Sequence, residues 1–255
     1  MYSVDTKVAP DGLLKDKVTI VTGASQGIGA AAAFGFARAG AKVVLAARRL
    51  GPIEEFAKRI RDNGSEAIAV ETDVANEESV KNLVERTVNH FGRLDCAFNN
   101  AGVDQKPALP HELSLEEWRY VFGVKCDGAF LGIKYQVPAM LATAGKGAIV
   151  NNGSVVGDRG VATLLAPCAS QAAIVGLTKA AAKAYGPNIR INMIATGGIR
   201  TAERFDMYPE GAMAHLPAKR PGTSEEVAST TAWLLSDYAS YHTGDVIPID
   251  GGYWA

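Results

Sequence analysis

The amino-acid sequence predicts an α/β protein built on a single doubly wound parallel sheet with helices on both faces. Short apolar runs alternate along the chain with longer amphipathic segments, which is the order expected when crossover helices join parallel strands. The short runs are almost continuously apolar, as expected for strands that are buried on both faces. A glycine-rich stretch at residues 22–29 joins the first apolar run to the first amphipathic segment.

Six short apolar runs are predicted to be the strands of this sheet. The first, Lys17–Thr22, is rich in β-branched residues, which favour extended backbone. The later runs share its short length and its apolar composition. In chain order, the predicted strands are residues 17–22, 42–47, 66–71, 94–98, 148–152 and 189–194.

Six longer segments are predicted to be helices, and residues typical of helix ends mark the first two. Gly40 follows the first helix, Pro52 stands near the start of the second, and Gly64 lies just past its end. In chain order, the predicted helices are residues 27–39, 52–63, 77–91, about 115–143, 166–185 and 224–235.

Length and composition indicate one globular domain. The chain has 255 residues, of which 47% are hydrophobic and 21% are charged, as in folded proteins. Because no repeat or linker divides the chain, we expect residues 13–255 to form a single domain behind a flexible N-terminal arm of residues 1–12. The arm is polar, unlike a secretory signal, and no apolar run approaches the roughly 20 residues that span a bilayer.

Charge and cysteine content argue against several kinds of partner. The formal net charge of −1 gives no reason to expect binding to nucleic acid or to a membrane surface. The three cysteines, Cys96, Cys126 and Cys168, lack the spacing of a metal site and are expected to be reduced thiols. The sequence is therefore expected to be that of a cytoplasmic protein with no bound metal.

The glycine-rich stretch, Thr22–Gly29, is predicted to bind the phosphates of a dinucleotide. Gly23 permits a tight turn, Gly27 allows the backbone to approach a pyrophosphate, and Gly29 allows the helix to pack closely on the strand. The N-terminus of the following helix presents backbone N–H groups and the positive end of its dipole. The alternative is a turn with no ligand. The place of the glycine-rich stretch between a strand and a helix favours a Rossmann-type nucleotide site.

The spacing Gly-x3-Gly-x-Gly resembles that of the classical short-chain dehydrogenase/reductase family, and the resemblance runs from about Leu14 to the C-terminus. Further matching motifs are Thr72-Asp73-Val74, Asn99-Asn100-Ala101-Gly102, Ile194–Thr201, Arg220-Pro221-Gly222, Glu225–Ala228 and Thr243-Gly244 with Asp250-Gly251-Gly252. The resemblance implies an NAD(P)(H)-binding oxidoreductase that interconverts an alcohol and a carbonyl compound and assembles as a homotetramer or homodimer. The cofactor contacts that it implies are Gly23, Ser25, Gln26, Gly27, Ile28, Gly29, Asp73, Val74, Asn100, Ala101, Gly102, Gln171, Gly197, Ile199 and Thr201.

The end of the second strand favours NADP(H) over NAD(H). An NAD site places an acidic residue there to hold the ribose hydroxyls, and this chain has Ala47 instead. Arg48 and Arg49 follow, and guanidinium groups pair well with a 2′-phosphate. The alternative is that both arginines are merely solvated.

The positions that carry catalysis in this family are altered. Family members use a Ser to polarise the substrate carbonyl, a Tyr to exchange the proton, and a Lys to lower the pKa of the Tyr and hold the nicotinamide ribose. Ser154 stands at the first position, but Pro167 and Gln171 stand at the Tyr and Lys positions, and Lys125 replaces a supporting Asn. Pro has no ionisable group, and Gln is neutral and cannot lower a neighbour's pKa.

Ser154, Lys125 and Asp158 are therefore the candidate catalytic residues. The ammonium group of Lys125 could polarise or protonate the substrate oxygen, and the alternative is a solvated or ion-paired lysine. Asp158, four residues after Ser154, could act as acid or base, and the alternative is a loop-capping aspartate. A positioned general acid contributes about 10² to 10⁴ in rate, so without a substitute the reaction would be slow.

Substrate identity is weakly encoded. By resemblance, Ile199–Arg220 closes over a small substrate such as a ketone or secondary alcohol. A slight excess of basic residues in this segment favours a polar or anionic substrate. Four apolar side chains of the same segment favour an apolar pocket, and both alternatives stay open. These side chains are Met207, Tyr208, Met213 and Leu216.

Three classes of function fit the sequence. The first is an NADP(H)-dependent oxidoreductase with a non-standard proton relay. The second is a catalytically inactive, NADP(H)-binding pseudoenzyme or regulator. The third is a lyase, cyclase or isomerase on the same fold, against which the retained cofactor motifs argue.

Overall fold

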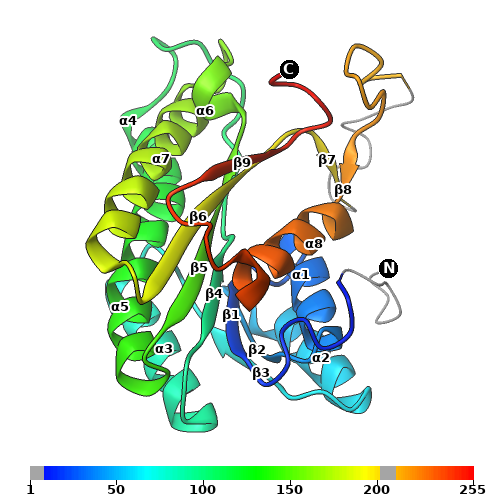
Figure 1. Ribbon diagram of the computed structural model, residues 1–255. Helices are drawn as coiled ribbons and strands as arrows, with labels where there is room; N and C mark the ends of the chain where they lie inside the picture. Colours follow the sequence, from blue (N-terminus) through cyan, green and yellow to red (C-terminus); the bar gives the residue numbers. More distant parts are fainter. Residues whose placement is uncertain (1–8, 202–210) are drawn as a thin grey trace.

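The computed structural model describes residues 9–201 and 211–255 and has the predicted doubly wound sheet (Figure 1). The seven strands are β1 Val18–Thr22, β2 Lys42–Ala47, β3 Ala67–Glu71, β4 Cys96–Asn99, β5 Gly147–Ser154, β6 Ile189–Thr196 and β9 Val246–Ile249. They lie in the order β3-β2-β1-β4-β5-β6-β9, and all their pairings are parallel. The chain thus winds outward from β1 on one side and from β4 on the other, which opens a crevice between them.

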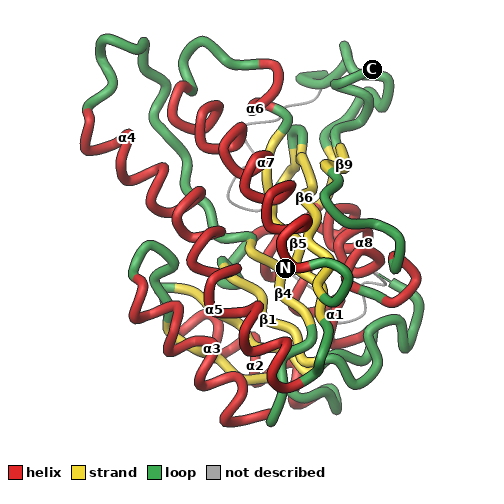
Figure 2. The backbone as a smooth tube through the Cα atoms, turned by 60° about the vertical axis from the view of Figure 1, so that its left-hand side comes forward, coloured by secondary structure: helices red, strands yellow, loops and turns green. Residues whose placement is uncertain are grey.

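Helices cover both faces of this sheet (Figures 1 and 2). Their bounds are α1 Gly27–Arg38, α2 Leu50–Asp62, α3 Glu77–Phe91, α4 Leu115–Phe122, α5 Gly128–Thr143, α6 Val156–Arg159, α7 Leu165–Tyr185 and α8 Ser224–Leu235. Helices α1, α2 and α8 share one core cluster with the sheet, and α3, α5 and α7 share the other. Among the described residues, no helix combines the length and apolarity needed to cross a bilayer.

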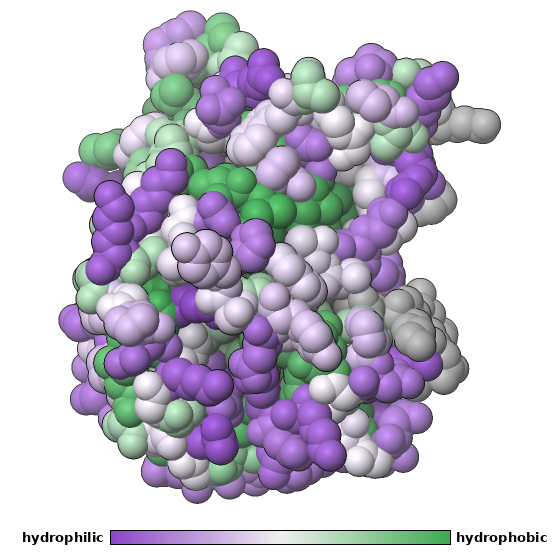
Figure 3. All heavy atoms as spheres, viewed as in Figure 1, coloured by the Kyte–Doolittle hydropathy of each residue, from purple (hydrophilic) through white to green (hydrophobic). Residues whose placement is uncertain are grey.

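The predicted strands and helices are all present, and β2, α3 and α8 have the predicted bounds. Strand β9 is not among the six runs because it includes Pro248, which cannot donate to a neighbouring strand. β9 is an edge strand, where a proline is tolerated. Its side chains are half-exposed or exposed, and Figure 3 shows an apolar band on this face over β9.

The helix predicted over residues 115–143 is interrupted. Between α4 and α5, Gly123–Asp127 forms a single π-helical turn, which carries Lys125. A π turn is one residue wider than an α turn and often lies at a functional site. Apolar periodicity alone did not reveal the interruption because helix continues on both sides of it.

A buried amide network joins the sheet to two of the helices that cover it. Asn99 of β4 exchanges hydrogen bonds with Gln136 of α5, at 2.8 and 3.2 Å, and donates to Asn151 of β5 at 3.1 Å. Asn151 in turn donates to the hydroxyl of Thr178 on α7 at 3.0 Å. Since buried polar groups are costly unless paired, this network restricts how α5 and α7 can sit on the sheet.

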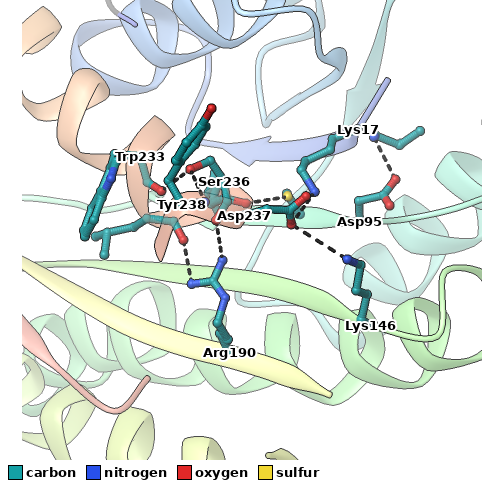
Figure 4. Close-up of polar contacts among 12 residues, drawn as sticks. Lys17, Asp95, Lys146, Arg190, Trp233, Ser236, Asp237 and Tyr238 are labelled. Carbon is teal, nitrogen blue, oxygen red and sulfur yellow. Dashed lines mark hydrogen bonds and ion pairs between the residues drawn. The ribbon is translucent and has the colours of Figure 1, made fainter. Parts of the chain in front are cut away.

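A second polar cluster lies at the amino ends of the strands, where α8 ends (Figure 4). Arg190 of β6 donates to the carbonyl oxygens of Leu234 at 2.8 Å and Ser236 at 2.9 Å. The carboxylate of Asp237 pairs with Lys17 at 3.1 Å and, more distantly, with Lys146 at 3.9 Å. Burial lowers the pKa of the Arg190 guanidinium. The cluster holds the end of α8 against the sheet at the amino ends of the strands, opposite the edge where ligands of such sheets bind.

The division of the chain into an arm and a domain stays a prediction. Ala9 and Leu14 are buried in the core beside α1 and α8, so packing begins before residue 13. The rest of the predicted arm, residues 1–8, lies outside the described residues.

Candidate active site

A groove of about 1320 Å³ runs along the carboxyl ends of the strands. Ligands of open α/β sheets bind at this edge. The groove is larger than the roughly 300–1,000 Å³ typical of a pocket for one small molecule. It therefore has room for a dinucleotide with a small substrate beside it.

The glycine turn after β1 forms one end of this groove. Gly27 has a φ of +55°, a left-handed conformation that favours glycine, and it lines the groove. A side chain at Gly29 would begin 2.3 Å from the carbonyl oxygen of Gly23, which only the absence of a Cβ avoids. The turn is therefore as tight as the phosphate-binding interpretation requires, and Gly29 packs against Gly23.

Two arginines flank the same end of the groove. Arg49 donates to the side chain of Gln26 at 2.6 Å and to the hydroxyl of Ser25 at 3.5 Å, so it lies over the glycine turn. Arg48 points the other way and donates to the hydroxyl of Tyr120 on α4 at 3.1 Å. Two guanidinium groups thus border the groove at the end of β2, where an anionic group could lie between them.

Hydrogen bonds between neighbouring strands position the middle of the groove. The Asn100 side chain donates to the carbonyl of Thr22 at 2.9 Å, and the Thr22 hydroxyl accepts from the backbone N–H groups of Asn100 and Ala101 at 2.9 and 3.1 Å. Asn152 donates to the side-chain oxygen of Asn100 at 2.8 Å. The segments after β1, β4 and β5 are thereby tied together across the crevice.

Ser154 and Lys125 both line the groove. Ser154 ends β5, and its hydroxyl donates to the carbonyl of Thr196 at 3.1 Å. Lys125 is half-buried and also lines the groove. A side chain at Gly102 would begin 3.3 Å from the Lys125 ammonium, so this cation lies against the loop that follows β4.

Pro167 and Gln171 line the groove from the first two turns of α7. Pro167 is the third residue of the helix. The first i→i−4 backbone hydrogen bond of this helix runs from the N–H of Cys168 to the carbonyl of Leu164. The N–H groups of the first turn have no acceptor within a helix. Proline, which lacks this N–H, is therefore tolerated at position 167, as expected. Gln171 is 2% exposed, and its Oε1 atom has no hydrogen-bond partner among the described residues.

The structure brings nearly all the predicted site residues to this groove. Ser154 and Lys125 line it, as do Arg48 and Arg49. Of the other predicted cofactor contacts, those that line it are Gly23, Ser25, Gln26, Gly27, Ile28, Asp73, Val74, Asn100, Ala101, Gly102, Gln171, Gly197, Ile199 and Thr201. Met213 and Leu216 also line it, whereas Met207 and Tyr208 lie outside the described residues.

Asp158 does not lie with the other two candidate catalytic residues. It belongs to α6, its side chain is 69% exposed, and it is not among the described residues that line the groove. Its carboxylate lies 3.7 Å from the guanidinium of Arg159. A solvated, ion-paired carboxylate of this kind favours the structural alternative for Asp158.

Three residues at or beside the groove escaped the sequence analysis. Tyr120 contacts Arg48, as described. Gln105, 4% exposed, accepts from the N–H of Ala166 at 3.0 Å and donates to the carbonyl of Thr163 at 3.0 Å, so it caps the start of α7. Tyr253 lines the groove from the C-terminal tail. No local pattern marks these residues, because their partners lie far away in the sequence.

The residues of the groove fit a dinucleotide. Gly29 packs so closely on Gly23 that a Cβ there would lie 2.3 Å from its carbonyl oxygen, and this is the tight turn that a pyrophosphate site requires. The buried oxygens of Gln171 and Asn152 have no hydrogen-bond donor in the described part of the chain. Since a buried acceptor without a donor costs about 1–3 kcal/mol, a ligand that carries hydroxyl groups, such as a ribose, would stabilise both.

Comparison with known proteins places this geometry in a family. Residues 23–254 match the family model described as enoyl-(acyl carrier protein) reductase. Cyclohexanol dehydrogenase of Acinetobacter sp. (strain SE19) is 40% identical over 93% of this chain and 95% of its own length. Cis-4-hydroxycyclohexanecarboxylate dehydrogenase of Sinomonas cyclohexanicum is 38% identical over 94% of this chain and 97% of its own.

A solved structure agrees with these matches. It is that of a putative NAD(P)-dependent gluconate 5-dehydrogenase from Beutenbergia cavernae with bound NADP at low occupancy. It superposes with a TM-score of 0.87, at 35% identity over 98% of this chain and 99% of the other. Fold, groove and relatives together define a nucleotide-dependent oxidoreductase. The chain belongs to the classical short-chain dehydrogenase/reductase family, whose substrates are alcohols and carbonyl compounds.

Proposed function

We propose that this protein is an NADP(H)-dependent oxidoreductase that interconverts a cyclic secondary alcohol and its ketone without the usual Tyr and Lys. The observation that carries the proposal is that one groove is lined by the glycine turn and Arg48 and also by Ser154 and Lys125. The relatives named above support a substrate with a six-membered ring, because two of them act on cyclohexane derivatives.

The preference for NADP(H) rests on the two arginines at the end of β2. Arg48 is held by the Tyr120 hydroxyl, and Arg49 by Gln26, so both cations border the space where an adenosine ribose would lie. Ala47 offers no carboxylate to bind ribose hydroxyls or repel a phosphate. A 2′-phosphate between the arginines would form charge-assisted hydrogen bonds, which are about twice as strong as neutral ones.

Sequence position supports the loss of the family's proton donor. Pro167 and Gln171 lie thirteen and seventeen residues after Ser154, where family members have Tyr and Lys. Gln171 keeps a polar contact with the ribose in this proposal, but as an acceptor rather than as a cation. Pro167 becomes an apolar wall of the substrate space.

The remaining residues supply the proton chemistry. A nicotinamide cofactor bound in the groove would supply or accept the hydride, and the chain's own residues must stabilise and protonate the substrate oxygen. The Ser154 hydroxyl can rotate from Thr196 to donate to that oxygen. Lys125 then stabilises the developing negative charge and provides the proton as the hydride arrives.

The test begins with a fluorescence titration of NADPH, followed by reduction of cyclohexanone in the same solution. We expect saturable binding and measurable turnover in wild type. We also expect faster turnover in the double variant Pro167→Tyr, Gln171→Lys, which restores the family's pair on an intact helix. Failure to bind NADPH would overturn the proposal.

A pseudoenzyme is the second candidate, and the residues at 167 and 171 favour it. In that case wild type binds NADPH with no turnover of cyclohexanone or of a panel of other ketones and quinones. Activity that appears only in the double variant would then show that the cofactor and substrate spaces are intact and that only the proton relay is missing.

A further inference from the structure

The C-terminal tail, residues 250–255, forms a wall of the groove. We propose that Tyr253 packs against the carbon skeleton of the substrate and determines which rings fit, an inference that rests on the proposed function. Tyr253 is the one tyrosine among the described residues that line the groove, and the residue is 39% exposed. Asp250 and Leu216 line the groove beside it.

Strand register places the tail at the substrate end of the groove. Ser154 of β5 pairs with Thr196 of β6, and Thr196 pairs with Ile249 of β9. Adjacent strands lie about 4.8 Å apart, so Ile249 is about 10 Å from Ser154 across the sheet. Tyr253 follows Ile249 by four residues. An aromatic side chain there reaches a substrate held at Ser154, rather than the adenosine end of the groove.

The backbone on both sides of Tyr253 is held in place. The carboxylate of Asp250 accepts from the N–H groups of Gly252 at 2.8 Å and of Trp254 at 2.9 Å. Gly252 lies so close to Pro217 that a side chain there would begin 2.6 Å from the proline ring. The ring of Tyr253 is therefore presented from a rigid turn, which reduces the entropy lost when a ligand packs against it.

Arg159 fastens this turn to the catalytic strand. Its guanidinium donates to the carbonyl of Trp254 at 2.9 Å. Arg159 ends α6, the short helix that begins two residues after Ser154. Asp158 lies 3.7 Å from the same guanidinium and helps to orient it. Arg159 is thus a positioning residue for Tyr253, and it connects the substrate wall to the segment that carries Ser154.

The groove around this wall suits an apolar ring better than a charged one. Val155, Val156, Leu164 and Pro167 line it from α6, α7 and the segments that precede them. A flat aromatic ring offers a large contact area at small entropic cost. We therefore assign cyclic alcohols and ketones, rather than short acyclic ones, as the substrates that depend on Tyr253.

The experiment compares cyclohexanone with acetone in four variants, with the NADPH affinity measured in each. For Tyr253→Ala we expect KM for cyclohexanone to rise about tenfold, while KM for acetone and the Kd of NADPH change less than twofold. Tyr253→Phe keeps the ring and should behave as wild type. Arg159→Ala should raise the cyclohexanone KM in the same direction, and Arg159→Lys should recover part of the loss.

Tyr238→Ala is the matched control, because Tyr238 is 79% exposed and lies at the opposite edge of the sheet. Equal effects of Tyr253→Ala on both ketones, or no effect, would overturn the inference. A Tyr253→Phe variant whose KM for cyclohexanone is as high as that of Tyr253→Ala would also overturn it. A change of molecular mass in Tyr253→Ala would place the tail at an interface between copies instead.

Calorimetric titration of cyclohexanone into protein saturated with NADP⁺ separates this inference from the proposed function. Binding that depends on Tyr253, without turnover in wild type, supports the substrate wall and contradicts the oxidoreductase. Turnover in wild type that Tyr253→Ala leaves unchanged supports the oxidoreductase and contradicts the substrate wall. No binding of cyclohexanone to wild type overturns both.

Discussion

Pro167 can replace an ionisable residue without damage to α7 because the first turn of a helix does not use its N–H groups. The structure confirms that position, since the helical ladder starts at Cys168. In the proposed mechanism, the proton chemistry comes from side chains on other segments. Of the candidates named from sequence, the groove contains Ser154 and Lys125, while Asp158 lies outside its described lining.

Lys125 is the residue on which turnover is expected to depend most. Lys125→Met removes the cation but keeps most of the volume, so kcat for cyclohexanone should fall by about 10² to 10⁴. The Kd of NADPH should stay within about threefold of wild type, because the change lies away from the phosphate end. Lys179→Met, at an exposed position of α7, is the control and should leave both values unchanged. Unchanged kcat in Lys125→Met would exclude Lys125 as the proton donor.

Arg48 is expected to select the cofactor. A hydrogen bond to a charged group contributes about 1.5–3 kcal/mol, so Arg48→Ala should weaken NADPH binding by about 10- to 100-fold. NADH binding should change little, because it lacks the 2′-phosphate. Tyr120→Phe removes only the acceptor that holds Arg48, so it should reduce the same preference by a smaller factor. Titration of wild type and both variants with NADPH and NADH checks this, and equal losses for both cofactors would contradict it.

At the scale of elements, long-range polar contacts fix the ends of helices that local sequence leaves undefined. The start of α7 has no capping side chain at its own N-cap residue, Leu164, and Gln105 supplies one from a distant loop. The end of α8 is held by Arg190 in the same way. By contrast, Thr223 and Glu226 form a capping box at the start of α8, and this is a local pattern.

Arg190→Met should destabilise the fold through the end of α8. The change removes the guanidinium donor from the carbonyl of Leu234, at a cost of about 1–3 kcal/mol, and leaves the carbonyl of Ser236 with only the longer hydrogen bond from the N–H of Ala239 at 3.3 Å. Urea unfolding should therefore show a lower midpoint with an unchanged slope. Lys146→Met is the control, since its ion pair is exposed and 3.9 Å long, and it should change stability by less than about 1 kcal/mol.

Glu226 is expected to make the stability of the fold at α8 depend on pH in the acidic range. Hydrogen bonds from Arg220 and from the backbone of Thr223 lower the pKa of Glu226 to about 2, below the value of about 4.3 for an unfolded chain. A carboxyl with a depressed pKa stabilises the fold above its unfolded pKa, and this contribution is lost as pH falls from about 4.5 to 2. Because the Glu226 side chain is 44% exposed, solvent screens part of the effect.

The check is a thermal-unfolding series between pH 2 and 5. Arg220→Met raises the pKa of Glu226, so the variant should lose less stability than wild type over this range. Arg119→Met, at an exposed position of α4, should follow the wild-type curve. Parallel curves for wild type and Arg220→Met would show that Glu226 does not contribute.

At the scale of the whole molecule, the edge strand β9 exposes an apolar band that a second copy of the chain could cover (Figure 3). Natural sheets usually protect such edges. The homotetramer or homodimer implied by family resemblance therefore stays a prediction that this surface favours. Light scattering should give two or four times the chain mass of 26.8 kDa.

Pro248→Glu tests that assembly without disturbing the core, since Pro248 is exposed. The charge at the edge should shift the mass toward the monomer, whereas Pro248→Ala should not. A monomeric wild type, or a Pro248→Glu variant with unchanged mass, would contradict the use of β9 as an interface.

The sequence by itself determined the α/β class, the order of the main strands and helices, and the phosphate turn. These features depend on local periodicity and on glycines that the backbone requires, so nearby residues suffice to predict them. It also indicated Ser154 and Lys125 as candidate catalytic residues, but only through family resemblance. The interruption at Lys125 and strand β9 were missed, because neither has a local pattern strong enough to stand out.

Only the tertiary structure decided which side chains share the groove and which do not. Tyr120 reaches Arg48 across 72 positions of sequence, and Arg159 reaches Trp254 across 95. Asp158, only four residues from Ser154, is turned to solvent beside Arg159. Contacts of this kind arise when strands distant in sequence end at one edge of the sheet, and sequence separation carries no information about them.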